Sequence, residues 1–235
     1  MQLTEPSLVI SPHYDDAVYS CWMAVDRAST VLTVFGGAPG QDIVAPWDIS
    51  TGFTSANAAI EARKKENSEA LSASDARIIN LDFVDVEYRQ LGVAPKVTAE
   101  DVIAGIRIAV ESHRTTYAPL GFGFTFRHVD HGLVREATKV LAREGADIIY
   151  YADIPYAMAM GVENWPQRLP YKVIRDLLGR EIEIEIIELT SLQQQQKRES
   201  VRLYTSQYEQ NNTISGRPFD HEDAFRWEVK VHPVK

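Results

Sequence analysis

Five short β-rich segments alternate with four helix-length segments over the first 150 residues of this 235-residue chain. The expected strands span residues 8–11, 31–35, 76–81, 115–120 and 147–151. The expected helices span residues 15–26, 56–72, 98–112 and 131–144, with a long loop over 42–55. Strands separated in this way pair in parallel, because a parallel crossover needs a connection of about a dozen residues or more. The alternation therefore predicts an α/β fold with a mostly parallel, doubly wound sheet.

The last third of the chain departs from this alternation. Residues 181–186 read Glu-Ile-Glu-Ile-Glu-Ile, a period of two that predicts a half-exposed strand with acid on its solvent face. A helix is expected over 191–207 and a final strand over 225–231. No repeat or linker divides the sequence, and its length suits one domain. We therefore expect residues 1–235 to form a single domain with a short β-containing C-terminal elaboration.

The charge balance and the cysteine content indicate which partners the protein does not bind and in which compartment it works. The formal net charge is −9, which argues against binding to nucleic acid or an anionic membrane surface, since both require Lys and Arg. Cys21 is the only cysteine, which excludes an internal disulfide and suits a reducing cytosol. The N-terminus lacks a signal-peptide pattern, and no run approaches the ~20 apolar residues of a membrane span. The sequence therefore predicts a cytoplasmic protein.

Three of the six histidines lie in two short clusters that combine imidazole with carboxylate. Residues 13–16 read His-Tyr-Asp-Asp and follow the first expected strand, while residues 128–131 read His-Val-Asp-His and follow the fourth. We expect the clusters to meet, because ligands of open parallel sheets bind beyond the carboxyl ends of the strands. A catalytic zinc site takes three protein ligands of these types and keeps one position for water. The clusters therefore predict a metal-dependent hydrolase.

The spacing within the clusters suggests which side chains hold the metal and which move protons. His13 and Asp16 lie three residues apart, so both side chains can face one point where a helix begins. His131 would complete the ligand set. Asp15 then stands beside the water, where a carboxylate can act as general base and later return the proton to a leaving amine.

Supporting roles follow for the remaining members of the second cluster. His128 is expected to act as a cationic donor to the developing oxyanion, and Asp130 to orient an imidazole. Two imidazoles and one carboxylate suit Zn²⁺, while Fe²⁺ or another divalent metal also accepts this ligand set.

Simpler interpretations exist for each cluster taken alone. Asp15 and Asp16 favour the positive N-terminal end of a helix and could simply cap it. A lone His128 or His131 is more often a surface residue or a satisfied core residue. Only the pairing of the clusters at matching strand ends favours a metal site over these alternatives.

Both clusters resemble the motifs of the LmbE-like, or PIG-L, family of zinc-dependent N-deacetylases. That family carries a His-Pro-Asp-Asp-Glu type motif after its first strand and a His-x-Asp-His motif further on. Weaker similarities run along most of the chain, at Arg63 with Glu66, at Asp85, at Pro155-Tyr156 and at residues 204–207. The resemblance implies a Rossmann-like three-layer fold that removes an acyl group, usually acetyl, from an amino sugar or similar conjugate.

The resemblance assigns the metal ligands, the general base and the oxyanion donor to the same residues as the chemical argument does. Three further side chains are expected to contact the substrate: Arg63, Asp85 and Arg127. Tyr14 replaces the usual proline and Ala17 the usual glutamate of the first motif. Phe126 occupies a position where some relatives place a tyrosine that polarises the scissile carbonyl, and Arg127 beside it is a candidate substitute.

These observations predict a zinc-dependent hydrolase whose small-molecule substrate is N-acylated and contains a sugar. Hydrolysis of another amide or N-acyl bond, in a tailoring or detoxification pathway, is the alternative within the same enzyme class. A non-catalytic carbohydrate- or nucleotide-binding module is the alternative outside it. The sequence leaves open whether the chain forms a homo-oligomer.

Overall fold

The computed structural model describes residues 6–25, 29–41, 43–122, 128–159, 165–167, 169–215 and 225–234. Seven strands form one sheet in the order β3-β2-β1-β4-β5-β7-β6. Their bounds are β1 Ser7–Ser11, β2 Ser29–Thr33, β3 Arg77–Asn80, β4 Thr115–Pro119, β5 Ile148–Tyr151, β6 Ile182–Glu188 and β7 Trp227–Pro233. The first five strands pair in parallel, and β7 pairs antiparallel with β5 and β6. The predicted mostly parallel sheet with a C-terminal β elaboration is confirmed.

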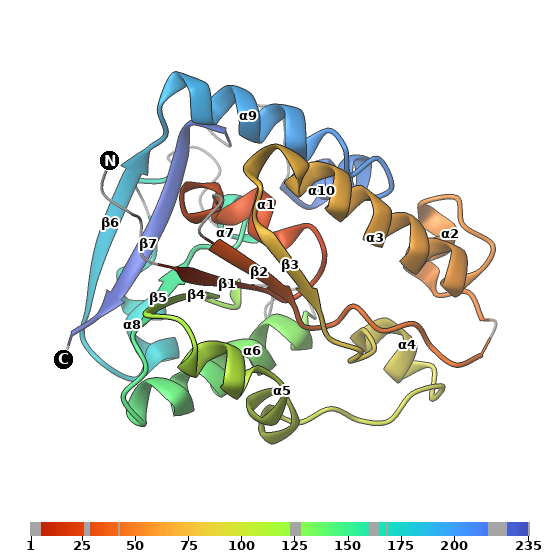
Figure 1. Ribbon diagram of the computed structural model, residues 1–235, viewed down its shortest axis with the longest axis horizontal. Helices are drawn as coiled ribbons and strands as arrows, with labels where there is room; N and C mark the ends of the chain where they lie inside the picture. Colours follow the sequence, from red (N-terminus) through yellow and green to blue (C-terminus); the bar gives the residue numbers. More distant parts are fainter. Residues whose placement is uncertain are drawn as a thin grey trace.

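Helices cover both faces of the sheet, which gives three layers (Figure 1). One layer holds α1 (Asp16–Ser20), α3 (Ala56–Leu71) and α9 (Ser191–Val201), with α10 (Tyr208–Ser215) beside them. The opposite layer holds α5 (Ala99–Glu111), α6 (Val129–Arg143) and α8 (Tyr171–Leu178). The remaining helical turns are short: α2 Pro46–Ser50, α4 Val86–Gln90, α7 Tyr156–Ala159, η1 Trp22–Ala24 and η2 Ser72–Ser74.

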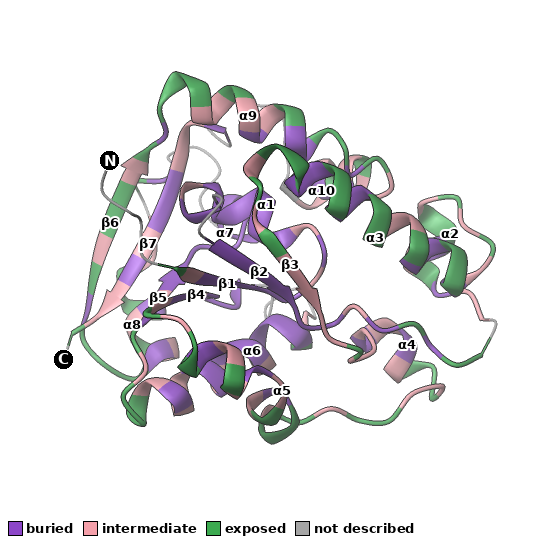
Figure 2. Ribbon diagram, viewed as in Figure 1, coloured by how far each residue is buried: buried purple, intermediate pink, exposed green. Residues whose placement is uncertain are grey.

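The central strands are buried because helices pack on both of their faces. β2 is buried along its whole length and β1 over all but its first residue, as Figure 2 shows for the middle of the sheet. The edge strand β6 alternates instead: Ile182 is buried, whereas Glu183 and Glu185 are exposed. The prediction of a half-exposed strand with acid on its solvent face is confirmed.

Strand order reverses between β1 and β4, which lie side by side in parallel register. β1 leads to β2 and β3 on one side, and β4 leads to β5 on the other. Such a switch point opens a crevice beyond the carboxyl ends of the strands. Both histidine clusters follow these two strands, so the topology itself brings them to the crevice.

Two expected helices are shorter than predicted because buried carboxylates bind backbone N–H groups that a longer helix would use. The helix expected over 15–26 ends at Ser20, and the next turn is η1, where Glu228 accepts hydrogen bonds from the N–H groups of Trp22 and Met23 (both 2.8 Å). The helix expected over 191–207 ends at Val201, since Glu66 accepts from the N–H of Ser206 (2.9 Å).

The loop expected over 42–55 contains the short helix α2. Pro46 occupies its first turn, where a missing N–H is no loss. Asp48 accepts a hydrogen bond from the N–H of Ala45 at 3.3 Å and so closes the N-terminus of the helix. Among the described residues, no helix is both long enough and apolar enough to cross a bilayer.

Candidate metal and catalytic site

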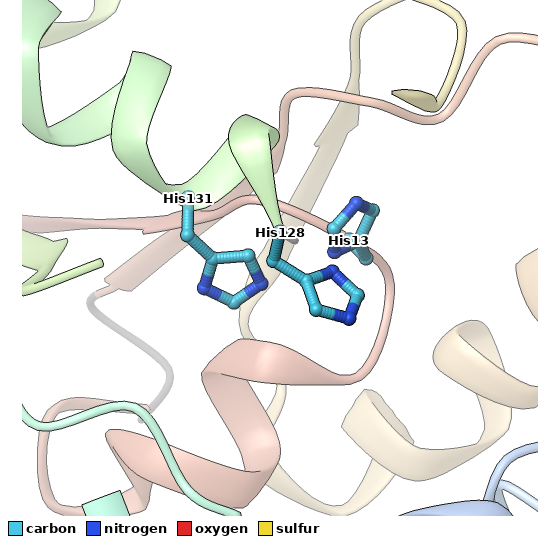
Figure 3. Close-up of side chains that lie close together, drawn as sticks. All are labelled: His13, His128 and His131. Carbon is cyan, nitrogen blue, oxygen red and sulfur yellow. The ribbon is translucent and has the colours of Figure 1, made fainter. Parts of the chain in front are cut away.

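Three imidazoles converge at the switch point between β1 and β4 (Figure 3). His13 lies on the loop after β1, while His128 and His131 lie at the start of α6. Ring centroids are 5.8 Å apart for His13 and His128, 5.2 Å for His13 and His131, and 5.5 Å for His128 and His131. The structure thus brings together the two clusters that lie more than 100 residues apart in the sequence.

A tight network of hydrogen bonds shapes the loop that carries the first cluster. Ser11 Oγ donates to the carbonyl of His13 (2.5 Å) and accepts from the N–H of Ala17 (2.9 Å). The carboxylate of Asp16 turns back to accept from the N–H of His13 (2.7 Å). These bonds place Asp16 Oδ2 beside the imidazole of His13, 3.3 Å from Nδ1.

Asp16 lies between the imidazoles of His13 and His131. The ring of His131 also contacts Asp153 through its other nitrogen. The Oδ2 atom of Asp16 is 3.4 Å from Nε2 of His131, while Nδ1 of His131 lies 2.6 Å from Oδ1 of Asp153. Asp153 is fully buried at the end of β5 and also accepts from the N–H groups of Gly121 (2.8 Å) and Phe122 (3.3 Å). A carboxylate on Nδ1 fixes the ring and leaves Nε2 facing the site.

The surroundings of Nε2 of His131, which faces the site, indicate whether a metal fits there. Nε2 of His131 is buried and has no hydrogen-bond partner within the described ranges. Leaving such an atom unpaired costs about 1–3 kcal/mol, which a coordinated cation would remove. Candidate ligand atoms of His13, His128 and His131 lie within 4.8 Å of one another, as do those of His13, Asp85 and Asp130. With Asp16 between two of these imidazoles, the donor set suits a divalent metal.

Two carboxylates face the other nitrogen of His13. Nε2 lies 3.2 Å from Oδ2 of Asp85 and 3.4 Å from Oδ2 of Asp130. Asp130 is fully buried, accepts from the N–H of Val86 (2.9 Å) and forms an ion pair with Arg89. Burial lowers the pKa of His13, but Asp85 and the other carboxylates outweigh it and raise that pKa well above its ordinary value. Asp130 and Asp85 therefore both contact the imidazole of His13, an arrangement that can fix the orientation of a ring.

The pKa values of Asp15 and Asp16, the adjacent carboxyl groups of the first cluster, are shifted in opposite directions. Burial and then the charge of Asp16 raise the pKa of Asp15 to about 6, and Asn211 donates to its Oδ2 atom at 3.1 Å. Burial opposes ionisation of Asp16 as well, but His131 and His13 outweigh it and lower the pKa of Asp16. Environments that separate two carboxyl pKa values in this way allow one group to stay charged while the other moves protons.

His128 differs from His13 and His131, because none of the carboxylates that the structure describes forms an ion pair with its ring. Burial, followed by the charges of His131 and His13, lowers the pKa of His128 to about 3. Its ring packs against that of Tyr156, with centroids 4.9 Å apart. The imidazole is therefore neutral near pH 7, so it would donate through an N–H rather than as a cation.

A polar wall faces the pocket on the side of α3 and α4. The buried carboxylate of Asp48 accepts from Arg63 (2.8 Å) and from the hydroxyl of Tyr88 (2.9 Å). Arg63 lines the pocket, so the structure places this side chain at the site. Glu87 lines the same wall, and burial followed by the charge of Asp85 raises its pKa to about 7.

A second part of the pocket lining, here called the C-terminal wall, is formed by Tyr204, Gln207 and Asn211. Tyr204 donates to the carbonyl of Tyr14 (3.1 Å), and Gln207 accepts from Trp47 Nε1 (3.0 Å). Glu66 holds the start of this wall, because its two carboxylate oxygens accept hydrogen bonds from the side chains of residues 205 and 206. The similarities noted at Glu66 and at residues 204–207 thus correspond to contacts that close the pocket.

Eight of the nine expected site residues lie in or against this pocket. Six of them line it: His13, Asp15, Asp16, Arg63, Asp85 and His128. Asp130 and His131 are buried just behind them. Arg127, like Phe126, lies outside the described residues. Asp48, Asp153 and Asn211 also belong to the site, although the sequence patterns did not predict them. For Asp153 a signal existed, since a carboxylate after the strand next to β4 belongs at the same edge.

Comparisons with known proteins agree with this picture. No family model matches the chain. It is 28% identical over 170 residues to a 2'-N-acetylparomamine deacetylase of Streptomyces fradiae, which covers 64% of this chain and 57% of that protein. It is 24% identical over 187 residues to a 2'-N-acetylparomamine deacetylase of Niallia circulans, which covers 63% of this chain and 66% of that protein. The chain thus spans less than two thirds of the length of these relatives.

Solved structures of deacetylases share the fold. A deacetylase of the teicoplanin biosynthesis pathway superposes with a TM-score of 0.74 at 22% identity, over 98% of this chain and 99% of the other. The zinc-inhibited form of teicoplanin deacetylase Orf2 gives 0.73 at 21% identity, over 98% and 99%. The A40926 pseudoaglycone deacetylase Dbv21 gives 0.70 at 23% identity, over 97% and 96%. The fold implied by the motif resemblance is confirmed, and the resemblance to N-deacetylases is supported by relatives of that name.

Proposed function

We propose that this protein is a metal-dependent hydrolase that removes an acyl group, most simply acetyl, from the amine of an amino sugar or glycoconjugate. The observation that carries the proposal is the unpartnered Nε2 of His131, which faces Asp16 and His13 beside a carboxylate suited to proton transfer. The deacetylase names of the relatives support the reaction class.

His13, Asp16 and His131 are the proposed ligands, and Zn²⁺ is the proposed metal. A divalent metal bound there would act as a Lewis acid and lower the pKa of water to about 7. Two fixed contacts support this ligand set, because Asp153 orients His131 and Asp130 orients His13. Fe²⁺ or another divalent ion remains compatible with the same ligands.

Asp15 is the proposed general base and acid. As a water oxygen bonds to the amide carbon, Asp15 takes the proton from that water. When the C–N bond breaks, Asp15 returns the proton to the nitrogen, so that one amide and one water give one carboxylic acid and one amine. A carboxyl pKa near 6 suits both transfers, since a group that must accept and release a proton works best with a pKa near ambient pH.

His128 is proposed to stabilise the charge that develops on the carbonyl oxygen. A neutral imidazole can donate one N–H, and a preorganised donor in a buried site contributes more than it would in water. Asp85 and Arg63 are proposed to contact the rest of the substrate, Arg63 with its guanidinium held by Asp48. We extend the same role to Arg127.

A small, sugar-containing N-acylated molecule is the proposed substrate. Aromatic side chains line the pocket next to the polar groups, among them Trp47, Tyr88 and Tyr156. Such rings stack on sugar faces while their polar atoms reach hydroxyl groups. The relatives carry the name of an acetylated amino-sugar glycoside, and we extend that class, rather than the individual compound, to this chain.

The proposal is tested by metal analysis combined with an amide-hydrolysis screen over N-acetylated amino sugars and glycosides. We expect about one zinc per chain in the wild type and loss of the metal in His13→Ala and His131→Ala. Asp15→Asn should keep the metal but lose most of the rate, about 10²- to 10⁴-fold for a general base. Asp82→Asn, an exposed carboxylate outside the pocket, is the control. Full metal occupancy in both histidine variants would remove them from the ligand set, and binding without turnover would favour a non-catalytic module.

A further inference from the structure

Asp15, the proposed general base, accepts a hydrogen bond from a residue that is distant in the sequence. Asp15 lies just before α1, and its Oδ2 atom accepts a hydrogen bond from Nδ2 of Asn211, 196 residues later, at 3.1 Å. Asn211 is only 5% exposed. Both side chains line the pocket, so the contact lies within the site and not on the outer surface.

Asn211 is itself fixed in place by the elements around it. Its backbone N–H donates to the carbonyl of Gln207 (3.0 Å), the first turn of α10. The side chain of Gln207 in turn accepts from Nε1 of Trp47 on α2. The Tyr19 hydroxyl lies beside the Asn211 amide, and the rings of Tyr19 and Tyr204 pack edge to face at 5.4 Å. The amide therefore comes from α10, which packs on α7, and lies beside Tyr19 of α1.

We propose that Asn211 is a positioning residue that holds the carboxylate of Asp15 in the orientation needed for proton transfer. This inference rests on the proposed function. An uncharged amide suits the task, because it fixes one carboxylate oxygen through an N–H without adding a positive charge that would weaken the base. The second oxygen is left for the proton of the water. In this role Asn211 acts through Asp15 and not on the reacting atoms themselves.

The first test is steady-state kinetics of Asn211→Ala and Asn211→Asp on metal-loaded protein. The aspartate variant keeps the size of the side chain and replaces its N–H donor with an acceptor. We expect kcat to fall about 10- to 100-fold, as for a catalytic group displaced by about 1 Å, with little change in KM and with metal content unchanged. Gln210→Ala is the matched control, because this amide lies on the same helix but donates to the carbonyl of Ser50 outside the pocket. It should retain the wild-type kcat.

A double-mutant cycle separates positioning from general structural damage. If Asn211 acts through Asp15, then adding Asn211→Ala to Asp15→Ala should not lower the residual rate further. A further fall equal to that seen in the wild-type background would overturn the inference.

A second readout does not depend on activity. In urea unfolding of the metal-free chain, the midpoint shifts of Asp15→Ala and Asn211→Ala should not add in the double variant, because both remove the same hydrogen bond. Additive shifts would overturn the inference. Failure of the metal-loaded wild type to hydrolyse any N-acetylated amino sugar or glycoside would count against the proposed function and its base. Hydrolysis that Asn211→Ala leaves unchanged would overturn the role of Asn211 alone.

Discussion

Replacing Asp153 with asparagine should weaken metal binding by changing which nitrogen of His131 carries the proton. The carboxylate receives three hydrogen bonds: Oδ1 lies 2.6 Å from Nδ1 of His131, while Oδ2 accepts from the N–H groups of Gly121 and Phe122. Asparagine has one acceptor oxygen and one NH₂ group. Its oxygen satisfies more donors when it faces the two backbone N–H groups, so the NH₂ group would face Nδ1.

The magnitude follows from this geometry. Nδ1 would then have to accept a hydrogen bond, and the ring proton would move to Nε2, the nitrogen proposed to bind the metal. The opposite orientation of the amide would leave two buried N–H groups facing a donor, at about 1–3 kcal/mol for each unpaired group. Loss of an outer carboxylate that orients a metal-binding histidine typically weakens metal affinity 10- to 100-fold, which corresponds to about 1.4 to 2.8 kcal/mol.

Two measurements check this prediction. Competition with a fluorescent zinc chelator should show the loss of affinity in Asp153→Asn and wild-type affinity in Asp147→Asn. Asp147 is the control because it also flanks β5 and accepts a hydrogen bond, from Thr115, but it lies at the other end of the strand and is exposed. Burial lowers the pKa of His131, but Asp16 and then Asp153 outweigh it and raise that pKa. Nitrogen NMR of the metal-free proteins above this pKa should find the His131 proton on Nδ1 in the wild type and on Nε2 in the variant. Unchanged tautomer and unchanged affinity would refute the reasoning.

Three further predictions concern stability and reactivity. Lys197→Met should destabilise the fold by about 3–5 kcal/mol in urea unfolding, because Lys197 and Glu228 form a fully buried ion pair at 2.6 Å and the variant leaves the carboxylate without its cation. Gly37→Ala should lower stability by about 1–3 kcal/mol, since a Cβ atom there would overlap the backbone of Asp82. The Cys21 thiol should not react with a thiol reagent at pH 8 in the native protein and should react after unfolding, because burial, and then the charge of Glu228, raises its pKa well above the ordinary value.

The two stability predictions each have a control variant that should behave differently. Arg226→Met removes a half-exposed ion pair with Glu188 and should change stability by no more than about 1 kcal/mol. A Cβ atom at Gly40 would meet nothing within 4 Å, so Gly40→Ala should be neutral. Equal effects in Lys197→Met and Arg226→Met, or in the two glycine variants, would contradict the burial argument. Rapid labelling of native Cys21 would contradict the third prediction.

Much of the fold could be predicted because the chain repeats one local rule. Apolar β-rich runs followed by helix-length segments identify parallel strands, and the Glu-Ile alternation over 181–186 identifies an edge strand with one face in solvent. Helix ends were predicted less well. At Ser20 and Val201 the helices stop where Glu228 and Glu66 bind nearby backbone N–H groups. Neither carboxylate is close in sequence to the helix that it ends, so no local pattern could reveal the effect.

The residues of the candidate site also fall into those that a local sequence pattern identifies and those that it does not. Residues of the two histidine clusters could be identified because each cluster is contiguous and follows a strand. Asp48 and Asn211 could not, because their partners are distant in the sequence and each looks locally like a loop or helix-face residue. Asp153 could have been identified from its place after the strand next to β4. The ligand set, the general base and the extent of the domain stay predictions.

The C-terminal wall has a consequence for how the site comes into being during synthesis. Both histidine clusters and Asp153 precede Tyr204, Gln207 and Asn211 by about 50 residues or more, so they leave the ribosome first. A nascent chain that has not yet reached this wall would already carry every proposed metal ligand, but its cleft would be open on one side and Asp15 would lack its partner. Synthesis from the N-terminus therefore presents the proposed ligands to a metal before the wall and the contact between Asn211 and Asp15 can form.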